Sequence, residues 1–207
     1  ILCSPHNPVG RVWSERELNI LADIICENNL ILITDEIHAD LVYAPNKHIP
    51  IATLNDDIAE RSISLTSPAK TFNLQAFQSA NAFVKNEDLR KKLVHEIHMS
   101  ALYLNPPLAQ TAIIAAYIKS DDWLAELLSY LMVNRDFVAK TLHDELPEIN
   151  MARPEGTYLA WLDFNGFNKS AEKIKSMLIH DAGLALNDGR SFGEEGSGYF
   201  RLNFGAP

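Results

Sequence analysis

The residues most able to do chemistry together fall into short groups. They are Ser67-Pro68-Ala69-Lys70, Asp35-Glu36-Ile37-His38-Ala39-Asp40, Asn7-Pro8-Val9-Gly10, and Arg201 within Tyr-Phe-Arg-Leu-Asn-Phe. Lys70 is the first candidate, because burial among small and apolar neighbours favours the neutral amine that Schiff-base chemistry requires. The alternative is an ordinary solvated lysine, since most lysines lie at the surface.

A carboxylate follows the apolar run at residues 30–33. Asp35, at the end of a buried strand, could hold a cationic ring nitrogen and keep it protonated, so that the ring accepts electrons. Two other interpretations are a helix N-cap and a metal site formed by Asp35, His38 and Asp40. Because the spacing of these residues matches no standard ligand motif, the metal site is the weaker interpretation.

Two further candidate side chains lie next to or within a predicted strand. Asn7 lies in a turn-forming segment with Pro8 and Gly10, just after an apparent strand end. Arg201 interrupts an otherwise apolar strand, where a guanidinium needs a partner. Its planar fork suits a carboxylate ligand, and a structural salt bridge is the alternative.

The elements that must position these groups begin with strands. The first residues read as the end of a strand, and further strands are predicted at 30–33, 61–66 and 80–84. A capping box at Ser14 predicts a helix to about residue 28. The apolar run at 30–33 predicts a parallel sheet covered on both faces. Ligands of such sheets bind beyond the carboxyl ends of the strands, which is where the candidate groups lie.

The second part of the chain has a different pattern. Helices are predicted at 86–98, 109–118, 120–146 and 170–181, and strands at 157–164, 184–186 and 199–204. We therefore predict an α/β protein with residues 1–119 as the C-terminal part of a large parallel-sheet domain. Residues 120–207 form a small α+β domain, incomplete at its end. The start at Ile1 and the end after a strand predict an excised portion of a longer protein.

Composition limits the partners of this chain. The 207 residues carry a formal net charge of −9, which argues against nucleic acid or an anionic membrane as a partner. Cys3 and Cys26 form neither a disulfide framework nor a zinc-ligand spacing. No apolar run is long enough to span a bilayer, so the cytoplasm is the default expectation.

In this order and spacing, the motifs NPVG, DEIH and SPAK with a late arginine resemble fold-type I pyridoxal-phosphate (PLP) enzymes. The superfamily is that of the class I/II aminotransferases. The segments PHNPVGRVW, TDEIHADL, SPAKTFNLQ, GTYLAWLDF and LNDGRSFGEEGSGYFRLNFGAP are similar to its cystathionine β-lyase type of carbon–sulfur lyase. The resemblance covers essentially the whole chain. It implies the type I PLP-dependent transferase fold, PLP as cofactor and a homodimer.

The resemblance also implies roles at the cofactor. Lys70 matches the lysine that carries PLP as a Schiff base and serves as the general base. Asp35 matches the acid that pairs with the pyridine nitrogen. Asn7 matches the asparagine that hydrogen-bonds the phenolic oxygen, and Ser67 matches a phosphate contact.

Two more positions bear on the substrate and the reaction. Arg201 matches the arginine that grips the substrate carboxylate. His38 stands where classical aminotransferases carry a tyrosine beside the phenolic oxygen, which implies a contact with the cofactor and is a feature shared with the lyase-like group. The sequence departs from many relatives at Gln78, where they have an arginine or another phosphate ligand, and at Ala76, where a glycine is frequent.

The resemblance therefore implies a PLP-dependent C–S β-lyase that converts cystathionine-like sulfur amino acids to thiol, pyruvate and ammonia. A class I/II aminotransferase is the alternative, and a non-catalytic fragment that binds a partner chain is the third hypothesis. The family has a long stretch before NPVG that supplies part of the phosphate site. We therefore expect these 207 residues alone to be inactive and to self-associate through exposed apolar surface.

Overall fold

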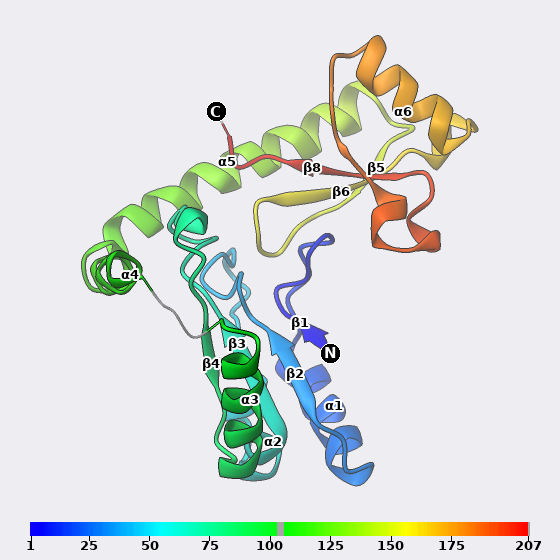
Figure 1. Cartoon of the computed structure of the whole chain (residues 1–207). Helices are drawn as coiled ribbons and strands as arrows, with labels where there is room; N and C mark the ends of the chain where they lie inside the picture. The colour runs from blue at the N-terminus through cyan, green and yellow to red at the C-terminus, as the bar shows by residue number, and fades with distance from the viewer. Residues whose placement is uncertain (103–105, 207) are drawn as a thin grey trace. The chain divides into compact units, whose positions relative to one another are not determined.

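The computed structural model describes residues 1–102 and 106–206, which divide into two compact units (Figure 1). Unit 1 comprises residues 1–5 and 12–126, and unit 2 comprises residues 6–11 and the chain from residue 127. The change of unit falls inside helix α5 (Asp121–Glu145). The predicted domains at 1–119 and 120–207 stay a prediction.

Unit 1 is built on a four-stranded sheet in the order β1-β2-β3-β4. β1 (Leu2–Cys3), β2 (Leu32–Asp35) and β3 (Ser62–Thr66) are parallel, while β4 (Asn81–Phe83) is antiparallel to β3. The strand predicted at 80–84 is therefore present, but the sheet is mixed. Because β1, β2 and β3 run in one direction, their carboxyl ends share one edge of the sheet.

Three helices in the described part of unit 1 begin at a residue whose side chain caps them. The Ser14 hydroxyl accepts a hydrogen bond from the Glu17 N–H, and the Glu17 carboxylate accepts one from the Ser14 N–H. Asn55 and Asn86 cap the next two helices in the same way, through their side-chain oxygens. The capped helices are α1 (Glu15–Glu27), α2 (Asp56–Arg61) and α3 (Glu87–Met99), and α4 (Pro107–Lys119) follows them.

The core of unit 1 covers one face of the sheet. Leu18 and Ile25 of α1 and Ile58 of α2 are buried against Leu32 of β2. Burying side chains of this size contributes about 1.5–3 kcal/mol each. Ile33, on the opposite face of β2, is 37% exposed. The predicted burial of this strand on both faces is therefore wrong for the described chain.

Unit 2 is built on a second four-stranded sheet, which is antiparallel and has the order β5-β6-β8-β7. Its strands are β5 (Asn150–Ala152), β6 (Leu159–Asp163), β7 (Asn187–Asp188) and β8 (Tyr199–Asn203). Most of α5 and the whole of α6 (Ala171–His180), which is capped by Ser170, complete this unit. Short 3₁₀ helices lie at Ile51–Thr53, Gln75–Phe77, Asn165–Phe167, Gly189–Phe192 and Glu194–Gly196.

Several predicted boundaries are wrong for local reasons. β2 begins at Leu32 because the N–H of Leu30 still bonds the Ile25 carbonyl across the left-handed Asn29, with a φ of 51°. The strand predicted at 184–186 is absent, since the Leu184 N–H instead bonds the Leu178 carbonyl at the end of α6. The short elements α2 and β5 were not predicted.

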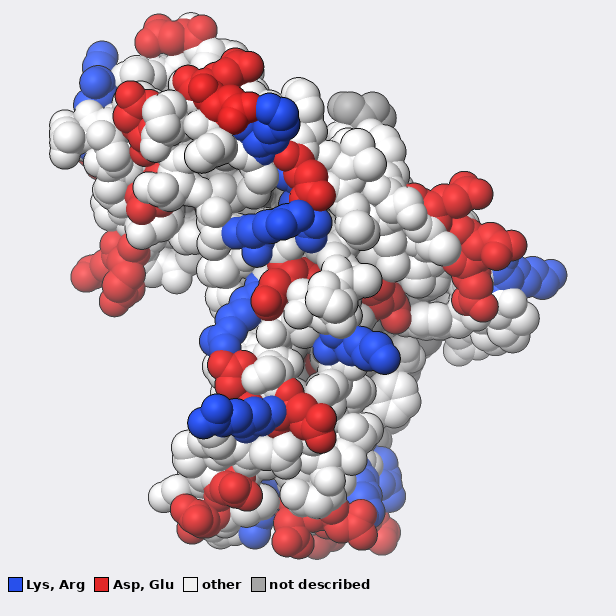
Figure 2. Space-filling view, turned by 180° about the vertical axis from the view of Figure 1, so that it is seen from behind, with Lys and Arg blue, Asp and Glu red and all other residues white. Residues whose placement is uncertain are grey.

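Charge is distributed in small groups over the surface. On the face shown in Figure 2, lysine and arginine side chains lie interspersed with aspartate and glutamate. Within residues 1–102 and 106–206, no helix combines the length and apolar character needed to cross a membrane. Because the face in Figure 2 shows charges of both signs, the expectation that nucleic acid is not a partner still depends on the net charge of the chain.

The capping box of α1 gives a test of the fold. Ser14→Ala removes the hydroxyl that accepts the Glu17 N–H, so we expect the free energy of unfolding to fall by about 1 kcal/mol. Urea denaturation followed by circular dichroism measures the change. Ser176→Ala, at an exposed position inside α6, is the control and should change stability by less than about 0.5 kcal/mol. Equal effects of the two substitutions would contradict the role of the cap.

Candidate active site

The candidate site of unit 1 lies at the carboxyl ends of β2 and β3. Asp35 is paired in register with Leu65, and the next N–H, of Glu36, bonds the Leu65 carbonyl at 2.8 Å. The two strands therefore end side by side. The turn that carries Lys70 follows β3 directly, as the sequence predicted.

Asp35 is half-buried and begins a turn. One of its carboxylate oxygens, Oδ1, accepts the N–H of Ile37 at 3.1 Å, and residues 37–40 are turns. The interpretation of Asp35 as a helix N-cap is therefore wrong. The second oxygen, Oδ2, makes no hydrogen bond within the described part of the chain, so it remains available to a donor from a ligand.

Lys70 lies in a turn fixed by two backbone hydrogen bonds. The N–H of Phe72 bonds the Pro68 carbonyl at 2.9 Å, and the N–H of Leu74 bonds the Ala69 carbonyl at 3.0 Å. The Lys70 side chain is half-buried. Its amine has neither an ion pair nor a hydrogen bond to any residue that the structure describes. The amine is therefore available to a ligand, and the choice between a reactive lysine and an ordinary solvated one stays a prediction.

Ser67 has a local structural role. Its side chain is 4% exposed, its hydroxyl donates to the Ser79 carbonyl at 2.6 Å, and the same oxygen accepts the Ala69 N–H at 3.1 Å. A phosphate group would compete with the bond to Ser79. The phosphate contact of Ser67 stays a prediction, while its hydroxyl visibly shapes the turn before Lys70.

Next to Asp35 in the sequence, Glu36 belongs to a group of buried polar side chains joined by hydrogen bonds. Glu36 is 4% exposed; its Oε1 accepts the Thr34 hydroxyl at 3.1 Å, and its Oε2 lies 3.0 Å from Nε2 of His48. The predicted site residue His38 is also buried, at 2% exposure. The described residues contain no group of three His, Cys, Asp or Glu side chains that could hold a metal ion, which leaves the metal interpretation of Asp35, His38 and Asp40 without support.

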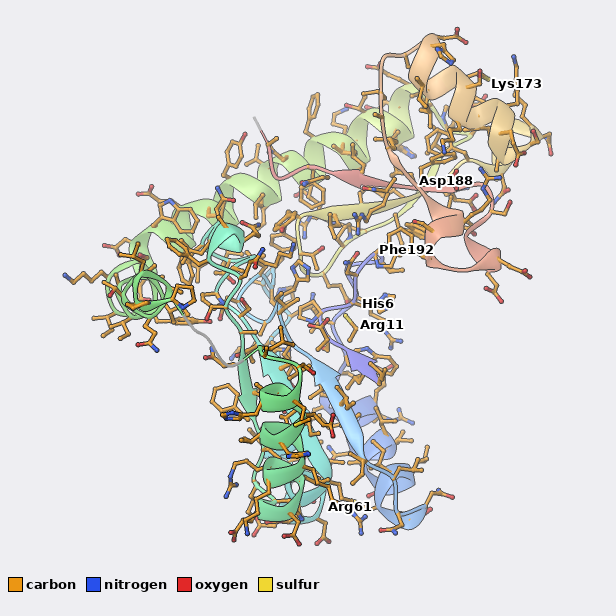
Figure 3. The ribbon with its side chains drawn as sticks, viewed as in Figure 1. His6, Arg11, Arg61, Lys173, Asp188 and Phe192 are labelled. Carbon is orange, nitrogen blue, oxygen red and sulfur yellow. The ribbon has the colours of Figure 1, made fainter. Side chains whose placement is uncertain are left out.

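In unit 2 the structure brings together two predicted residues that are far apart in sequence. Nη1 of Arg201 donates to Oδ1 of Asn7 at 2.8 Å, and Nη2 donates to Oδ1 of Asn187 at 3.0 Å. The guanidinium carbon lies 5.1 Å from the centroid of the Phe192 ring, which is a cation–π contact; Phe192 is labelled in Figure 3.

Arg201 keeps an unused donor. Its Nε is buried and has no hydrogen-bond partner among the described residues. Within residues 1–102 and 106–206 no carboxylate pairs with this guanidinium. The structural salt bridge considered as the alternative is therefore not found. A part-buried guanidinium whose partners among the described residues are neutral amide oxygens is well suited to an anionic ligand.

Asn7 is held by the segment 6–11, which belongs to unit 2 (Figure 3). The His6 N–H bonds the Arg11 carbonyl at 2.8 Å and closes this loop. Burial of the imidazole and, second, the charge of Arg11 lower the pKa of His6. The ring next to Asn7 is therefore neutral at pH 7 and adds no second cation beside Arg201.

Gly10 packs the same segment against residues 154–156. Its carbonyl accepts the N–H groups of Glu155 and Gly156, both at 2.9 Å. A Cβ atom at Gly10 would lie 2.6 Å from the Cβ of Pro154 and 2.9 Å from the carbonyl oxygen of Gly156. Gly10 also has a φ of +77°, so both its conformation and its contacts require glycine.

The strand that supplies Asn187 is held by an arginine fork. Arg190 donates to Asp188 from its backbone N–H at 3.1 Å, from Nε at 3.0 Å and from Nη2 at 2.7 Å. These hydrogen bonds, with the Arg190 side chain first, hold the pKa of the Asp188 carboxyl well below its usual range. Asp188 therefore stays ionised and keeps β7 in place beside Arg201.

Sequence reasoning missed the partners of Arg201. Asn187 and Phe192 lie in the segment LNDGRSFGEEG, where the Gly-rich composition suggested only a loop. The signal for Asn187 is its register, because it pairs directly with Arg201 across β7 and β8. No sequence pattern identified the contact of Phe192, which depends on the 3₁₀ turn at Gly189–Phe192.

Comparison with known proteins gives the family. The sequence profile described as "Aminotransferase class I and II" matches residues 1–207. The chain belongs to the class I and II aminotransferase family. Cystathionine beta-lyase PatB of Bacillus subtilis (strain 168) is similar to it, with 36% identity over 205 residues, which are 99% of this chain and 53% of that protein.

Solved structures of family members share the fold. A PLP-bound putative aminotransferase from Clostridium difficile 630 has a TM-score of 0.97 and 39% identity, over 100% of this chain and 53% of that one. Cystalysin from Treponema denticola, whose structure contains pyridoxal 5'-phosphate, has a TM-score of 0.97 and 32% identity, over 100% of this chain and 52% of that one. The predicted type I PLP-dependent transferase fold is confirmed, and the chain spans about half the length of these class I and II aminotransferase relatives.

The contact at Gly10 gives a test of unit 2. Gly183 shares the left-handed conformation, with a φ of +67°, but an added Cβ would meet nothing within 4 Å. We expect Gly183→Ala to cost about 1–2 kcal/mol of stability through backbone strain alone. Gly10→Ala should cost about 1–3 kcal/mol more, because the methyl group overpacks against Pro154.

Urea denaturation of the two variants in parallel measures the difference. Equal losses of stability would show that the close approach of Gly10 to residues 154–156 does not contribute.

Proposed function

We propose that the whole protein is a PLP-dependent carbon–sulfur β-lyase acting on cystathionine-like sulfur amino acids. The observation that carries the proposal is the Lys70 amine, which has no partner among the described residues and lies on the turn after β3, beside the strand that ends in Asp35. The names of the relatives supply the reaction class, since PatB of B. subtilis is a cystathionine beta-lyase at 36% identity. The shared fold with PLP-containing cystalysin supports the choice of cofactor.

The donor set of unit 1 fits PLP. An amine without a protein partner suits the aldehyde of the cofactor, and a half-buried carboxylate with one unused oxygen suits a protonated pyridine nitrogen. We assign these roles to Lys70 and Asp35. His38, Ser67 and Asn7 are also proposed to contact the cofactor.

When bound, the pyridinium ring of PLP withdraws electrons from the substrate carbon. Asp35 would keep the ring nitrogen protonated, because a negative charge beside it favours the cationic form. Arg201 would bind the substrate α-carboxylate through the positive charge of its guanidinium, which no described carboxylate neutralises. Lys70, once released from the cofactor, would take the proton from Cα as the general base.

The bond changes then define the lyase. The Cα–H bond breaks and its proton moves to Lys70. The electron pair left at Cα forms a Cα=Cβ double bond while the Cβ–S bond breaks, and sulfur leaves with the electron pair of that bond as a thiolate, which takes up a proton. Addition of water to the remaining three-carbon unit gives pyruvate and ammonia.

An aminotransferase is the second candidate. It is favoured by the C. difficile structure, a putative aminotransferase that is 39% identical to this chain. The two reactions share the proton removal by Lys70 and differ in the next bond to change. We favour the lyase because His38 stands at the position where classical aminotransferases carry a tyrosine. A homodimer in the cytoplasm is part of the proposal and rests on the resemblance alone.

The role of Lys70 is tested by chemical trapping in the full-length protein. After incubation with PLP and reduction with borohydride, we expect the cofactor to be attached to the peptide that contains Lys70. Lys70→Ala should remove this adduct and lower the turnover by at least about 10³-fold, as loss of an essential base does. Peptide mass spectrometry and turnover measure the two effects.

Lys47→Ala, at an exposed loop position, is the matched control and should leave both readings unchanged. Normal turnover in Lys70→Ala would refute the assignment.

The choice between lyase and aminotransferase needs one assay of the full-length protein. With cystathionine as substrate and no added keto acid, we expect pyruvate and thiol in equal amounts, because β-elimination needs no amino acceptor. A lactate dehydrogenase-coupled assay measures pyruvate, and a thiol reagent measures the other product. Turnover that requires an added keto acid would instead establish the aminotransferase.

A further inference from the structure

The residues directly after Lys70 are held by side chains from other parts of unit 1. Thr71 is 1% exposed, and its hydroxyl donates to Oδ2 of Asp40 at 2.9 Å. Asp40 lies in the turn that follows β2, whereas Thr71 lies in the turn that follows β3. This hydrogen bond therefore ties together the two turns that carry Asp35 and Lys70.

The next residue, Phe72, is held by aromatic contacts. Its ring centroid lies 5.4 Å from that of Tyr117 at an interplanar angle of 83°, which is the favourable edge-to-face geometry. The Trp123 ring lies 5.8 Å away on the same unit. Both partners belong to helices, Tyr117 to α4 and Trp123 to the first turns of α5.

Tyr117 connects the polar and the aromatic contacts. Its ring packs on Phe72, while its hydroxyl hydrogen-bonds the Asp40 carboxylate. Burial, followed by the Asp40 charge and this hydrogen bond, raises the pKa of Tyr117 to about 12. The hydroxyl therefore stays protonated at pH 7 and acts as a donor to Asp40.

The aromatic contacts alone leave room for movement. A hollow of about 350 Å³ adjoins Phe72, and on the α4 side it is lined by small side chains that include Ala112 and Ala116. A ring beside such a space can shift, whereas a buried hydroxyl that loses its acceptor leaves an unsatisfied group. The bond from Thr71 to Asp40 is therefore the contact that fixes the position of the turn.

We propose that Asp40 is a positioning residue for Lys70, acting through the Thr71 hydroxyl and Tyr117. Asp40, Thr71 and Tyr117 form a clamp that sets the backbone position from which the Lys70 amine reaches its target. The inference rests on the proposed function, because the position of this turn affects the reaction only if Lys70 is the reactive amine. A displacement of about 1 Å in a reacting group can lower a rate on the order of 10²-fold.

The test uses the full-length protein with PLP and a variant that removes one hydroxyl. Thr71→Val keeps the shape of the side chain but cannot donate to Asp40. We expect it to slow the attachment of PLP to Lys70, trapped by borohydride at timed intervals, by about tenfold or more, and to lower kcat similarly. KM should stay within about twofold, because no group that binds the substrate is changed.

Conservative and control variants distinguish an effect on the position of Lys70 from a general loss of protein stability. Thr71→Ser retains the hydroxyl and should restore the attachment rate to within about threefold of the unmodified protein. Thr111→Val removes an exposed hydroxyl bond to the Pro107 carbonyl on α4 and should change neither rate. Tyr117→Phe keeps the ring contact with Phe72 and removes only the donor to Asp40; it should slow attachment by about threefold and serves if Thr71→Val does not fold.

A double variant tests whether Asp40 and Thr71 act through the same hydrogen bond. Asp40→Ala combined with Thr71→Val should slow attachment no more than Asp40→Ala alone, since Asp40→Ala already removes the acceptor of the Thr71 hydroxyl. Attachment and kcat unchanged in Thr71→Val would overturn the inference, as would a loss in thermal stability alone. If PLP never attaches to Lys70 in the unmodified protein, the proposed function fails; if it attaches there at equal rates in all variants, only the clamp fails.

Discussion

The parallel pairing of β2 with β3 is the constraint on which the candidate site of unit 1 depends. Parallel strands end at the same edge of a sheet, so the carboxylate that closes β2 and the turn that follows β3 must be neighbours. The pairing of Asp35 with Leu65 fixes their register. A slip by one residue would turn Asp35 toward the face packed on α1 and remove it from the edge.

The pairing of the strands determines which residues lie at the edge of the sheet, and side-chain hydrogen bonds then hold the turn that carries Lys70. The turn at Lys70 is stabilised from inside by Ser67, whose hydroxyl bonds the Ser79 carbonyl and the Ala69 N–H. It is stabilised from outside by Asp40 through Thr71. The amine itself has no such partner in the described chain, so rigidity surrounds a group that is left chemically available. This is the arrangement that preorganised sites require.

Much of the fold could be predicted from local signals. The Ser14 capping box and the apolar stripe of α1 are properties of adjacent residues, and the helix occurs where they place it. β7 could not be predicted in this way, because Asn187–Asp188 is polar and its strand geometry comes from pairing with β8 and from the Arg190 fork. The antiparallel direction of β4 is likewise set by the chain path and not by its composition.

In the candidate site, too, some residues could be predicted from local sequence and others depend on contacts with distant segments. Lys70 and Asp35 could be found because each follows an apolar strand, and the motifs added their roles. The contact between Asn7 and Arg201 joins residues at the two ends of the chain, and nothing in either segment encodes its partner. The role of Asp40 was also hidden, since its neighbour Asp35 carries the recognisable chemistry while its own partner lies in the SPAKT segment.

The coordination of Arg201 has an electrostatic consequence. Its acceptors, Asn7 and Asn187, are uncharged, so the guanidinium contributes a full positive charge to its surroundings in a chain whose formal net charge is −9. That cation attracts small anions over a range of about 10 Å at 0.1 M ionic strength, and the attraction weakens as salt is added. Chloride or sulfate at high concentration would therefore compete with an anionic ligand for Arg201, so these salts would do more than set the ionic strength.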